Sequence, residues 1–225
     1  DIAKDLVNEV KLEKSYNDFY IPRIKWTSEA SFLSAQYINR HQNELDLWAI
    51  DTASNTSSIL LTETDAAYVD VTDNLTFLKD NSFIWTSEKD GYNHLYYYSK
   101  TGKLINQLTQ GNWEVTTYYG CDEKNKRIYY QSVENGSINR DVYSVGLNGK
   151  NKRRLSAKTG TNAAAFSADF TYYINTFSSA IIPPTYTLNS SSDGQVLKTI
   201  KTNDALVEKL GAYRISEKVF STISV

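Results

Sequence analysis

The sequence has no methionine, a single cysteine and only two histidines among its 225 residues. One cysteine, Cys121, excludes a disulfide within the chain and any zinc site built from cysteines. The two histidines, His41 and His94, leave little for a histidine-rich metal centre, so we expect no metal and no cofactor. Because even position 1 is not methionine, we expect the chain to be a mature or internal piece of a longer protein.

Long apolar runs and a strong excess of charge of either sign are also missing. No stretch approaches the 18 or so apolar residues that a membrane-spanning helix needs, and no signal-peptide pattern opens the chain. The 24 lysines and arginines nearly balance the 26 aspartates and glutamates, which leaves a formal net charge of −2. This balance excludes a protein that binds nucleic acids or anionic membranes through bulk electrostatics.

Aromatic residues are abundant instead, with 17 tyrosines, 8 phenylalanines and 4 tryptophans. Between residues 19 and about 201 they stand in short aromatic or β-branched runs, separated by glycine, asparagine, aspartate and serine. Such turn-punctuated runs are typical of an all-β protein. Examples are Phe32–Ile38, Leu45–Ile50, Phe83–Thr86, Leu95–Tyr98, Arg127–Gln131 and Val142–Val145.

The two ends of the chain differ from this pattern. Residues 1–13 mix charged and apolar positions that fit either a short helix or an irregular arm. Near the other end, only residues 204–210 look helical. Asn203 or Asp204 would be the N-cap of this helix, and Gly211 would be the C′ glycine that follows it.

A unit of four strands recurs about every 45 residues. The last two strands of a unit are joined by a polar turn, which contains Gly102, Gly149 or Gly194 in three of the units and so accommodates positive φ. Four strands at this period are typical of a β-propeller blade. A β-sandwich has similar strand spacing but would not repeat its turn chemistry at one period. The closing segments of the units are Leu61-Thr62, Leu108-Thr109, Leu155-Ser156 and Thr199-Ile200.

Four units make either a small closed ring or part of a larger propeller. A blade buries both faces against its neighbours, so four blades of a larger ring leave two apolar faces open to self-association. The missing methionine favours the second reading, and we expect an all-β propeller fragment of about four four-stranded antiparallel blades. The expected parts are an arm at 1–18, blades at about 19–66, 67–112, 113–160 and 161–202, and a last segment at 203–225.

Motifs that carry chemistry are mostly missing. The sequence has no Gly-x-Ser-x-Gly nucleophile elbow, no His-Glu-x-x-His, no EF-hand or Walker loop and no Gly-x-Gly-x-x-Gly. Residues 122–127 look like a calcium loop but lack its glycine and final glutamate, so we interpret them as a hairpin turn. We interpret His94 as a structural hydrogen-bonding residue in a tight turn, and Cys121 as a small, half-buried side chain. The polar tip at residues 39–42 either caps its turn or contacts a partner.

The segment Phe83–Tyr96, which reads FIWTSEKDGYNHLY, resembles a signature of the propeller domain of the dipeptidyl peptidase IV family, which are prolyl-oligopeptidase-type serine peptidases. Gln107–Val115 is similar to the family as well, because Gly-x-Trp-Glu-Val follows the Leu-Thr that ends a blade. Taken in order, the similar segments cover about residues 20–213. The others are Tyr20–Trp26, Ile38–Asn43, Asn139–Ser144, Tyr172–Asn175, Pro183–Leu188 and Asn203–Leu206.

The resemblance implies the C-terminal half of an eight-bladed propeller, in which residues 203–225 form a short helix and a linker strand toward an α/β-hydrolase domain. The serine, aspartate and histidine of the family's triad lie in that domain, so no catalytic residue is expected here. The family also holds the free amino group of its substrate with two adjacent glutamates. No Glu-Glu pair occurs in this sequence.

Some members of the family place a Phe-Arg pair near the substrate cavity. Counting back from Phe77, the corresponding places are Asp70 and Val71, so this sequence lacks the Phe-Arg pair that makes that contact. The resemblance therefore implies that the loop of residues 68–73 lines the cavity, with Tyr68 and Asp70 at its rim.

For function, the resemblance implies a parent enzyme that removes Xaa-Pro or Xaa-Ala dipeptides from peptide N-termini through a Ser-His-Asp acyl-enzyme. The propeller would gate the substrate and take no part in the chemistry. Its partners would be peptide substrates, the missing hydrolase domain and the remaining blades. Such peptidases are usually exported to the periplasm or the cell surface. The alternative is a free-standing TolB-like binding propeller without enzymatic activity.

Overall fold

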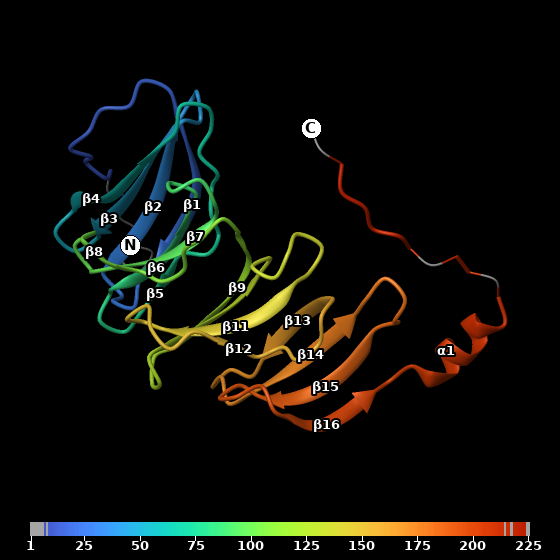
Figure 1. Cartoon of the computed structure of the whole chain (residues 1–225). Helices are drawn as coiled ribbons and strands as arrows, with labels where there is room; N and C mark the ends of the chain where they lie inside the picture. Colours follow the sequence, from blue (N-terminus) through green and yellow to red (C-terminus); the bar gives the residue numbers. More distant parts are fainter. Residues whose placement is uncertain (1–6, 8, 214, 217, 224–225) are drawn as a thin grey trace. The chain divides into compact units, whose positions relative to one another are not determined.

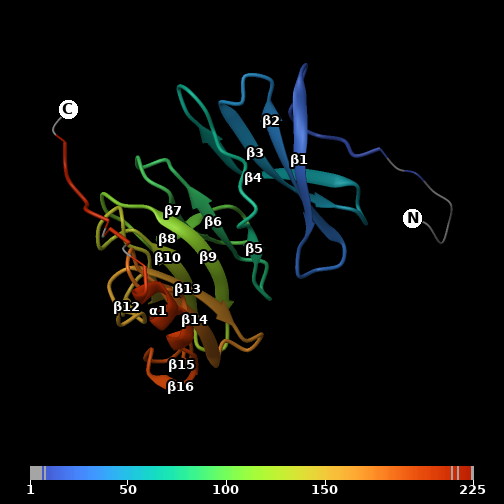
Figure 2. The same ribbon diagram turned by 90° about the vertical axis from the view of Figure 1, so that its right-hand side faces the viewer.

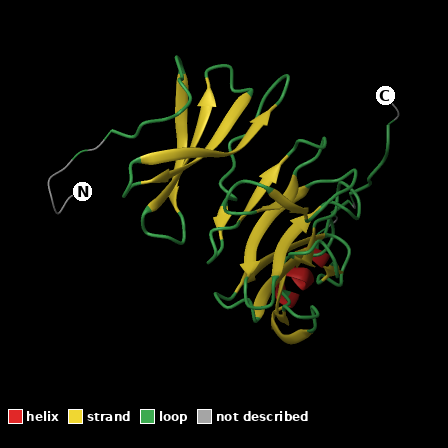
Figure 3. Ribbon diagram, turned by 90° about the vertical axis from the view of Figure 1, so that its left-hand side faces the viewer, coloured by secondary structure: helices red, strands yellow, loops and turns green. Residues whose placement is uncertain are grey.

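A computed structural model describes residues 7, 9–213, 215–216 and 218–223. The chain divides into two compact units, Asp1–Thr109 and Gln110–Val225, which we describe separately. The described residues form sixteen strands and one short helix, shown in yellow and red in Figure 3. The expected all-β class is therefore confirmed.

The first unit contains two four-stranded antiparallel sheets, in each of which the strands lie side by side in chain order (Figures 1 and 2). The first sheet consists of β1 (Phe19–Trp26), β2 (Phe32–Asn39), β3 (Glu44–Asp51) and β4 (Thr56–Thr64). The second sheet consists of β5 (Thr76–Phe77), β6 (Phe83–Ser87), β7 (His94–Tyr98) and β8 (Leu104–Gln107).

The second unit repeats this arrangement with two further antiparallel sheets of four strands. The third sheet consists of β9 (Val115–Asp122), β10 (Arg127–Ser132), β11 (Asp141–Gly146) and β12 (Arg153–Arg154). The fourth sheet consists of β13 (Thr161–Phe166), β14 (Tyr172–Ser178), β15 (Thr185–Ser190) and β16 (Val196–Lys201). Four such sheets are the expected propeller blades.

Helix α1 (Asp204–Gly211) follows the last strand, where the sequence predicted a helix. Its N-cap is one of the two predicted residues, and its C-terminal end differs from the prediction. Asn203 is the N-cap residue, but its backbone is left-handed and its side chain caps nothing, while Gly211 lies inside the helix and Ala212 ends it. The described residues after α1 form no strand, and those before β1 form an irregular arm. No helix among the described residues is long and apolar enough to cross a membrane.

Glycine is required in the turn before the last strand of a blade for two reasons. Gly102, Gly149 and Gly194 have φ of 79°, 72° and 81°, as the sequence predicted. In addition, a Cβ on Gly102 would overlap the carbonyl oxygen of Leu60 in the preceding sheet, and a Cβ on Gly194 would overlap that of Leu155. The turns at Gly102 and Gly194 therefore pack against the neighbouring blade at a distance that only glycine permits.

The recurring hydroxyl at the end of a blade also has a structural role. In the second sheet, the Leu95 amide donates a hydrogen bond of 2.9 Å to Thr109 Oγ1, and His94 Nδ1 lies 3.0 Å from the same oxygen. His94 is fully buried at the start of β7. The hydroxyl thus ties the end of a blade to the start of its third strand, and His94 is the structural hydrogen-bonding residue that the sequence suggested.

The third sheet makes the same connection around a buried carboxylate. The Val142 amide donates to Ser156 Oγ at 3.1 Å, and that hydroxyl donates to Asp141 Oδ1 at 2.8 Å. Asp141 is completely buried, and it also accepts hydrogen bonds from Arg154 and Asn162. A buried charge is tolerated only when it is paired and hydrogen-bonded in this way.

Apolar and aromatic side chains hold the two sheets of each unit together. In the first unit, Trp85 and Phe83 of β6 pack with Leu47 of β3, and the cluster includes Leu60 and Leu61 of β4. In the second unit the cluster consists of Tyr129, Val142, Leu155 and Tyr173. Alternation along β6 brings Phe83 and Trp85 to the same face, which explains their spacing in the sequence.

The arm before β1 covers the other face of the first sheet. Tyr16 packs against Tyr37 and Trp48, and the Trp48 indole donates a hydrogen bond of 2.8 Å to the Tyr16 hydroxyl. Lys14 Nζ lies 2.6 Å from a carboxylate oxygen of Asp46, whose side chain is 1% exposed. The Tyr16 hydroxyl donates to the same oxygen, and the arm is thereby fastened to β3.

Candidate functional site

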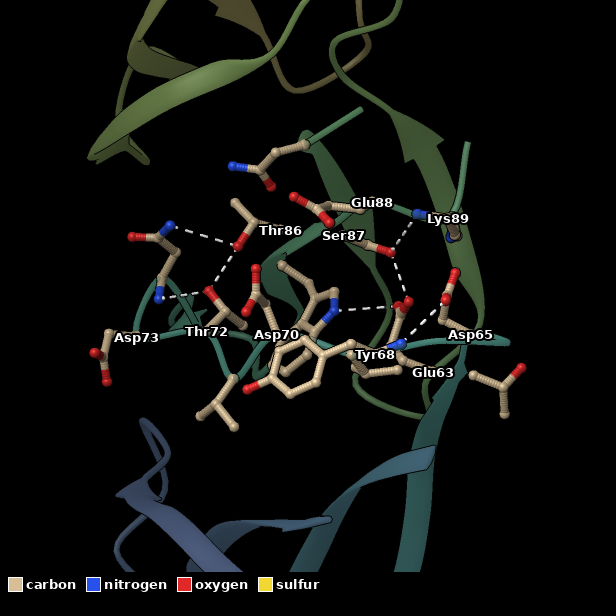
Figure 4. Close-up of a pocket in the computed structure, with 16 residues that line it drawn as sticks. Glu63, Asp65, Tyr68, Asp70, Thr72, Asp73, Thr86, Ser87, Glu88 and Lys89 are labelled. Atoms are coloured by element: carbon tan, nitrogen blue, oxygen red, sulfur yellow. Dashed lines mark hydrogen bonds between the residues drawn. The ribbon is translucent and has the colours of Figure 1, made fainter. Parts of the chain in front are cut away.

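A hollow of about 540 Å³ lies in the first unit, where the segment between β4 and β5 passes the end of β6 (Figure 4). The segment of residues 65–74 forms much of its lining, and β4, β6 and the turn after β6 supply the rest. Tyr68 and Asp70 both line this hollow. The expectation that they form the rim of a substrate cavity stays a prediction.

The floor of the hollow is built around Glu63 at the end of β4. One of its carboxylate oxygens accepts a hydrogen bond of 3.2 Å from the Trp85 indole, and the other accepts one of 2.6 Å from the Ser87 hydroxyl. Trp85 is 1% exposed and Ser87 is 6% exposed. Both oxygens of Glu63 and the hydroxyl of Ser87 are thus committed to holding β4 against β6, which makes the floor a fixed surface.

Two backbone hydrogen bonds attach the start of the lining segment to the tip between β2 and β3. The Asp65 amide donates to the carbonyl of Asn43 at 3.0 Å, and the Val69 amide donates to that of Gln42 at 2.8 Å. The tip also caps itself, because the Asn39 side chain accepts from the Asn43 amide. This polar tip therefore caps its own turn and holds the lining segment.

Side chains attach the end of the same segment. Arg23 of β1 forms an ion pair with Asp73, which holds the pKa of that carboxyl below its usual range. The hydroxyls of Thr72 and Thr86 are 2.6 Å apart, and Gln36 of β2 donates its side-chain amide to the Thr72 carbonyl at 2.8 Å.

Between these attachments, Tyr68 remains 50% exposed. The Asp65 carboxylate accepts hydrogen bonds from the Ala67 and Tyr68 amides, which lower the pKa of Asp65 and fix the turn that presents the tyrosine. Figure 4 shows Tyr68 and Asp70 among the residues around the hollow. An exposed aromatic ring on an anchored loop is suited to contact with a ligand.

The lining of the hollow is rich in carboxylates, and Lys89 is the one amine among the residues that line it. Burial lowers the pKa of Lys89, although Glu63 and Asp90 oppose this. Its ammonium group lies 3.9 Å from the centre of the Tyr96 ring and donates to the Tyr98 hydroxyl at 2.7 Å. The lysine is therefore directed toward these rings. The carboxylates of the lining belong to Glu63, Asp65, Asp70, Asp73 and Glu88.

The sequence profile described as "Dipeptidyl peptidase IV (DPP IV) N-terminal region" matches residues 2–184. The chain belongs to this family. The resemblance that the sequence suggested is confirmed.

Solved structures show the same relationship. The crystal structure of Porphyromonas gingivalis dipeptidyl peptidase 4 is similar with a TM-score of 0.91 and 37% identity, over 98% of this chain and 31% of that one. The structure of a putative dipeptidyl aminopeptidase IV from Bacteroides ovatus has a TM-score of 0.71 and 25% identity, over 82% of this chain and 29% of that one. Four four-stranded sheets in this relationship identify the fold as part of a DPP IV propeller.

Curated relatives agree with the structures. A probable dipeptidyl peptidase 4 from Arthroderma benhamiae is 28% identical over 218 residues, which are 93% of this chain and 28% of the relative. Dipeptidyl peptidase 4 from Arthroderma otae is 34% identical over 145 residues, which are 64% of this chain and 19% of the relative. The chain thus spans less than a third of the length of these relatives.

The other candidates from the sequence have structural roles in this DPP IV-type propeller. In the turn after β9, the Asp122 carboxylate accepts hydrogen bonds from the amide and the side chain of Asn125, as expected of a hairpin turn. Cys121 is half-buried, and burial raises the pKa of its thiol to about 12, which leaves it unreactive at neutral pH. No group of three or more potential metal ligands occurs among the described residues.

Sequence reasoning missed Glu63, Ser87, Lys89 and Gln36. The glutamate and the serine come from different blades, 24 positions apart. The periodicity of a strand predicts contacts within its own sheet. It gives no signal for Glu63 and Ser87, because their contact depends on how one blade packs on the next. Ser87 and Lys89 lie in the segment Phe83–Tyr96 that carries the family resemblance, but the resemblance assigned them no role.

Proposed function

We propose that this chain is the substrate-gating, non-catalytic propeller part of a dipeptidyl peptidase IV-like serine exopeptidase. The parent enzyme would release Xaa-Pro or Xaa-Ala dipeptides from peptide N-termini. The observation that carries the proposal is the likeness to P. gingivalis dipeptidyl peptidase 4, with a TM-score of 0.91 at 37% identity over 98% of this chain. The sequence contains no nucleophile elbow, so the acyl-enzyme would form on a domain outside these 225 residues.

In this proposal the hollow of the first unit is one wall of the substrate cavity. Its floor is fixed by Glu63, and the anchored loop presents Tyr68 and Asp70 as the rim. A fixed wall lowers the entropy that is lost when a peptide is positioned for attack. Asp70 and Val71 stand where some relatives offer a phenylalanine and an arginine, so the positive charge of that arginine is missing at this place.

The proposal is tested by assaying the complete gene product and the 225-residue chain side by side with Gly-Pro-anilide. We expect the complete protein to release the anilide and to lose this activity with a serine-directed inhibitor. The chain alone should hydrolyse nothing. Inhibitor-sensitive turnover by the pure chain, or an inactive complete protein, would contradict the proposal, and the second result would favour a binding propeller.

We also propose where the blades begin and end and where the parent protein is located. The four sheets with their connections would be consecutive blades at about 19–66, 67–112, 113–160 and 161–202, and residues 203–225 would lead toward a hydrolase domain. Export to the periplasm or the cell surface would follow from the activity on peptides.

Apolar side chains on two strands suggest that the isolated chain associates with itself. Ile24 and Trp26 of β1 are 67% and 57% exposed, and Tyr172 and Ile174 of β14 are 47% and 41% exposed. Exposed apolar surface of this kind drives association in water. We expect light scattering to give at least a dimer for the 225-residue chain, and a well-behaved monomer would contradict this part of the proposal.

A further inference from the structure

Gln36 is a buried polar residue of β2 that lies outside the hollow of the candidate site. Gln36 is 2% exposed and is paired with Leu47 of β3. Its side-chain nitrogen donates a hydrogen bond of 2.8 Å to the carbonyl of Thr72. Because a carbonyl only accepts, this contact fixes which end of the amide is the nitrogen.

The other end of the same side chain has no partner. Gln36 Oε1 is buried and accepts no hydrogen bond from any of the described residues. The residue Gln36 also lines a second, smaller hollow of about 190 Å³, together with Thr72 and Asp73. An unsatisfied buried acceptor is destabilising, so an apolar side chain of the same length would remove this cost and thereby offset the loss of the hydrogen bond to Thr72.

The glutamine at the corresponding place in the third sheet has hydrogen-bond partners for both ends of its side-chain amide. Gln131 lies on the second strand of its sheet, is 8% exposed and donates to the backbone carbonyl of Asn162 in the next sheet at 2.6 Å. Its own Oε1 accepts a hydrogen bond of 2.7 Å from Thr116. Gln131 thus uses both ends of its amide, the nitrogen toward the next sheet and the oxygen toward β9 of its own sheet, whereas Gln36 uses one end only.

What Gln36 holds is the loop of the candidate site. Thr72 belongs to the segment that carries Tyr68 and Asp70, and its hydroxyl is 2.6 Å from that of Thr86 on β6. The Gln36 contact attaches the carbonyl side of the same residue to β2. The two contacts fix Thr72 between two blades, and through it the rim of the hollow.

We propose that Gln36 is a positioning residue for the substrate rim, held in the core for its contact with Thr72 at a cost in stability. The part concerning substrate rests on the proposed peptidase function. Loosening the loop would leave the reacting groups unchanged, but it would add the entropy of ordering the rim to every binding event. The effect should therefore fall on KM and leave kcat unchanged.

The test compares Gln36→Met with the matched control Gln131→Met. In the 225-residue chain, we expect Gln36→Met to keep its Tm or to raise it by about 2 to 4 °C, and Gln131→Met to lower it by a similar amount. Hydrogen exchange of the amides of residues 65–74 should become about tenfold faster in Gln36→Met and remain unchanged in Gln131→Met. In the complete gene product, KM for Gly-Pro-anilide should rise about fivefold in Gln36→Met at constant kcat.

The measurements separate the two proposals. If the unmodified complete protein releases no dipeptide, the peptidase function fails, and hydrogen exchange and Tm still decide whether Gln36 positions the loop. A Tm loss in Gln36→Met as large as that in Gln131→Met would overturn the inference, because Gln36 would then be a stabilising core residue. Unchanged exchange in residues 65–74 would overturn it as well, and so would a loss in kcat at constant KM.

Discussion

Replacing Gly102 by alanine should lower the free energy of unfolding of the chain by about 3 to 5 kcal/mol. One part of this loss is the strain of an L-residue at φ of 79°. The larger part comes from the new Cβ, which would overlap the backbone carbonyl of Leu60 in the neighbouring blade. A backbone carbonyl in a strand cannot rotate away as a side chain could, so β4 or the turn itself has to move.

Two other glycines separate these contributions. Gly91 has φ of 98° but open space around its Cβ position, so Gly91→Ala should cost only about 1 to 2 kcal/mol. Gly211 lies in α1 with neither constraint, and Gly211→Ala should be neutral or stabilising. Urea unfolding of the three variants provides the measurement. Equal losses in Gly102→Ala and Gly91→Ala would show that the close approach to Leu60 contributes nothing.

Replacing Asp46 by alanine should cost about 1.5 to 3 kcal/mol, because the change removes a buried, charged acceptor that three hydrogen-bond donors share. The Asp46 carboxylate, 1% exposed, accepts hydrogen bonds from Lys14 and Tyr16 of the arm and from Thr62 of β4. The matched control is Glu44→Gln, which removes the other carboxylate on Lys14. Glu44 is 41% exposed, so its loss should cost less than about 1 kcal/mol in urea unfolding.

The Asp46 contacts also predict a dependence on pH. Burial by itself would raise the pKa of Asp46, but the hydrogen bonds from Lys14, Thr62 and Tyr16 outweigh it and hold the pKa below 3.8. A carboxyl with a depressed folded pKa stabilises the fold above its unfolded pKa and loses this contribution as the pH falls through the folded value. The difference in unfolding free energy between the native chain and Asp46→Asn should therefore be full at pH 7 and shrink below about pH 4. A difference that does not change between pH 7 and pH 3 would contradict this assignment.

The blade architecture could be predicted from the sequence because its signals are local. The turn glycines, the closing hydroxyls and the alternating aromatic residues each lie within one unit of about 45 residues, and each corresponds to a contact in the structure. For example, Thr109 belongs to a Leu-Thr pair that recurs in the sequence, and the structure explains the pair, because the Thr109 hydroxyl is hydrogen-bonded to β7. The helix was predicted for the same reason, although the role of Gly211 was wrong, since the helix continues through it.

The candidate site could not be predicted to the same extent, because its contacts join separate blades. Gln36 meets Thr72 across 36 positions, and Glu63 meets Ser87 across 24. Neither pair has a spacing that a strand or a turn imposes. Tyr68 and Asp70 were found only through their alignment with a family motif, and the family-similar segments that contain Arg23 and Thr86 gave no indication that these residues anchor the loop.

The order of strands within each sheet has a consequence for how the chain folds. Every sheet is a meander in which each strand pairs with the one before it in the sequence, so the hydrogen-bonded ladders close over short loops. Contacts of low sequence separation form quickly, and a chain emerging from the ribosome can complete one blade before the next is made. The contact of Gly102 with Leu60 and the link from Gln36 to Thr72 can form only when two blades are present. Blade docking, rather than strand pairing, is then the slow step of assembly.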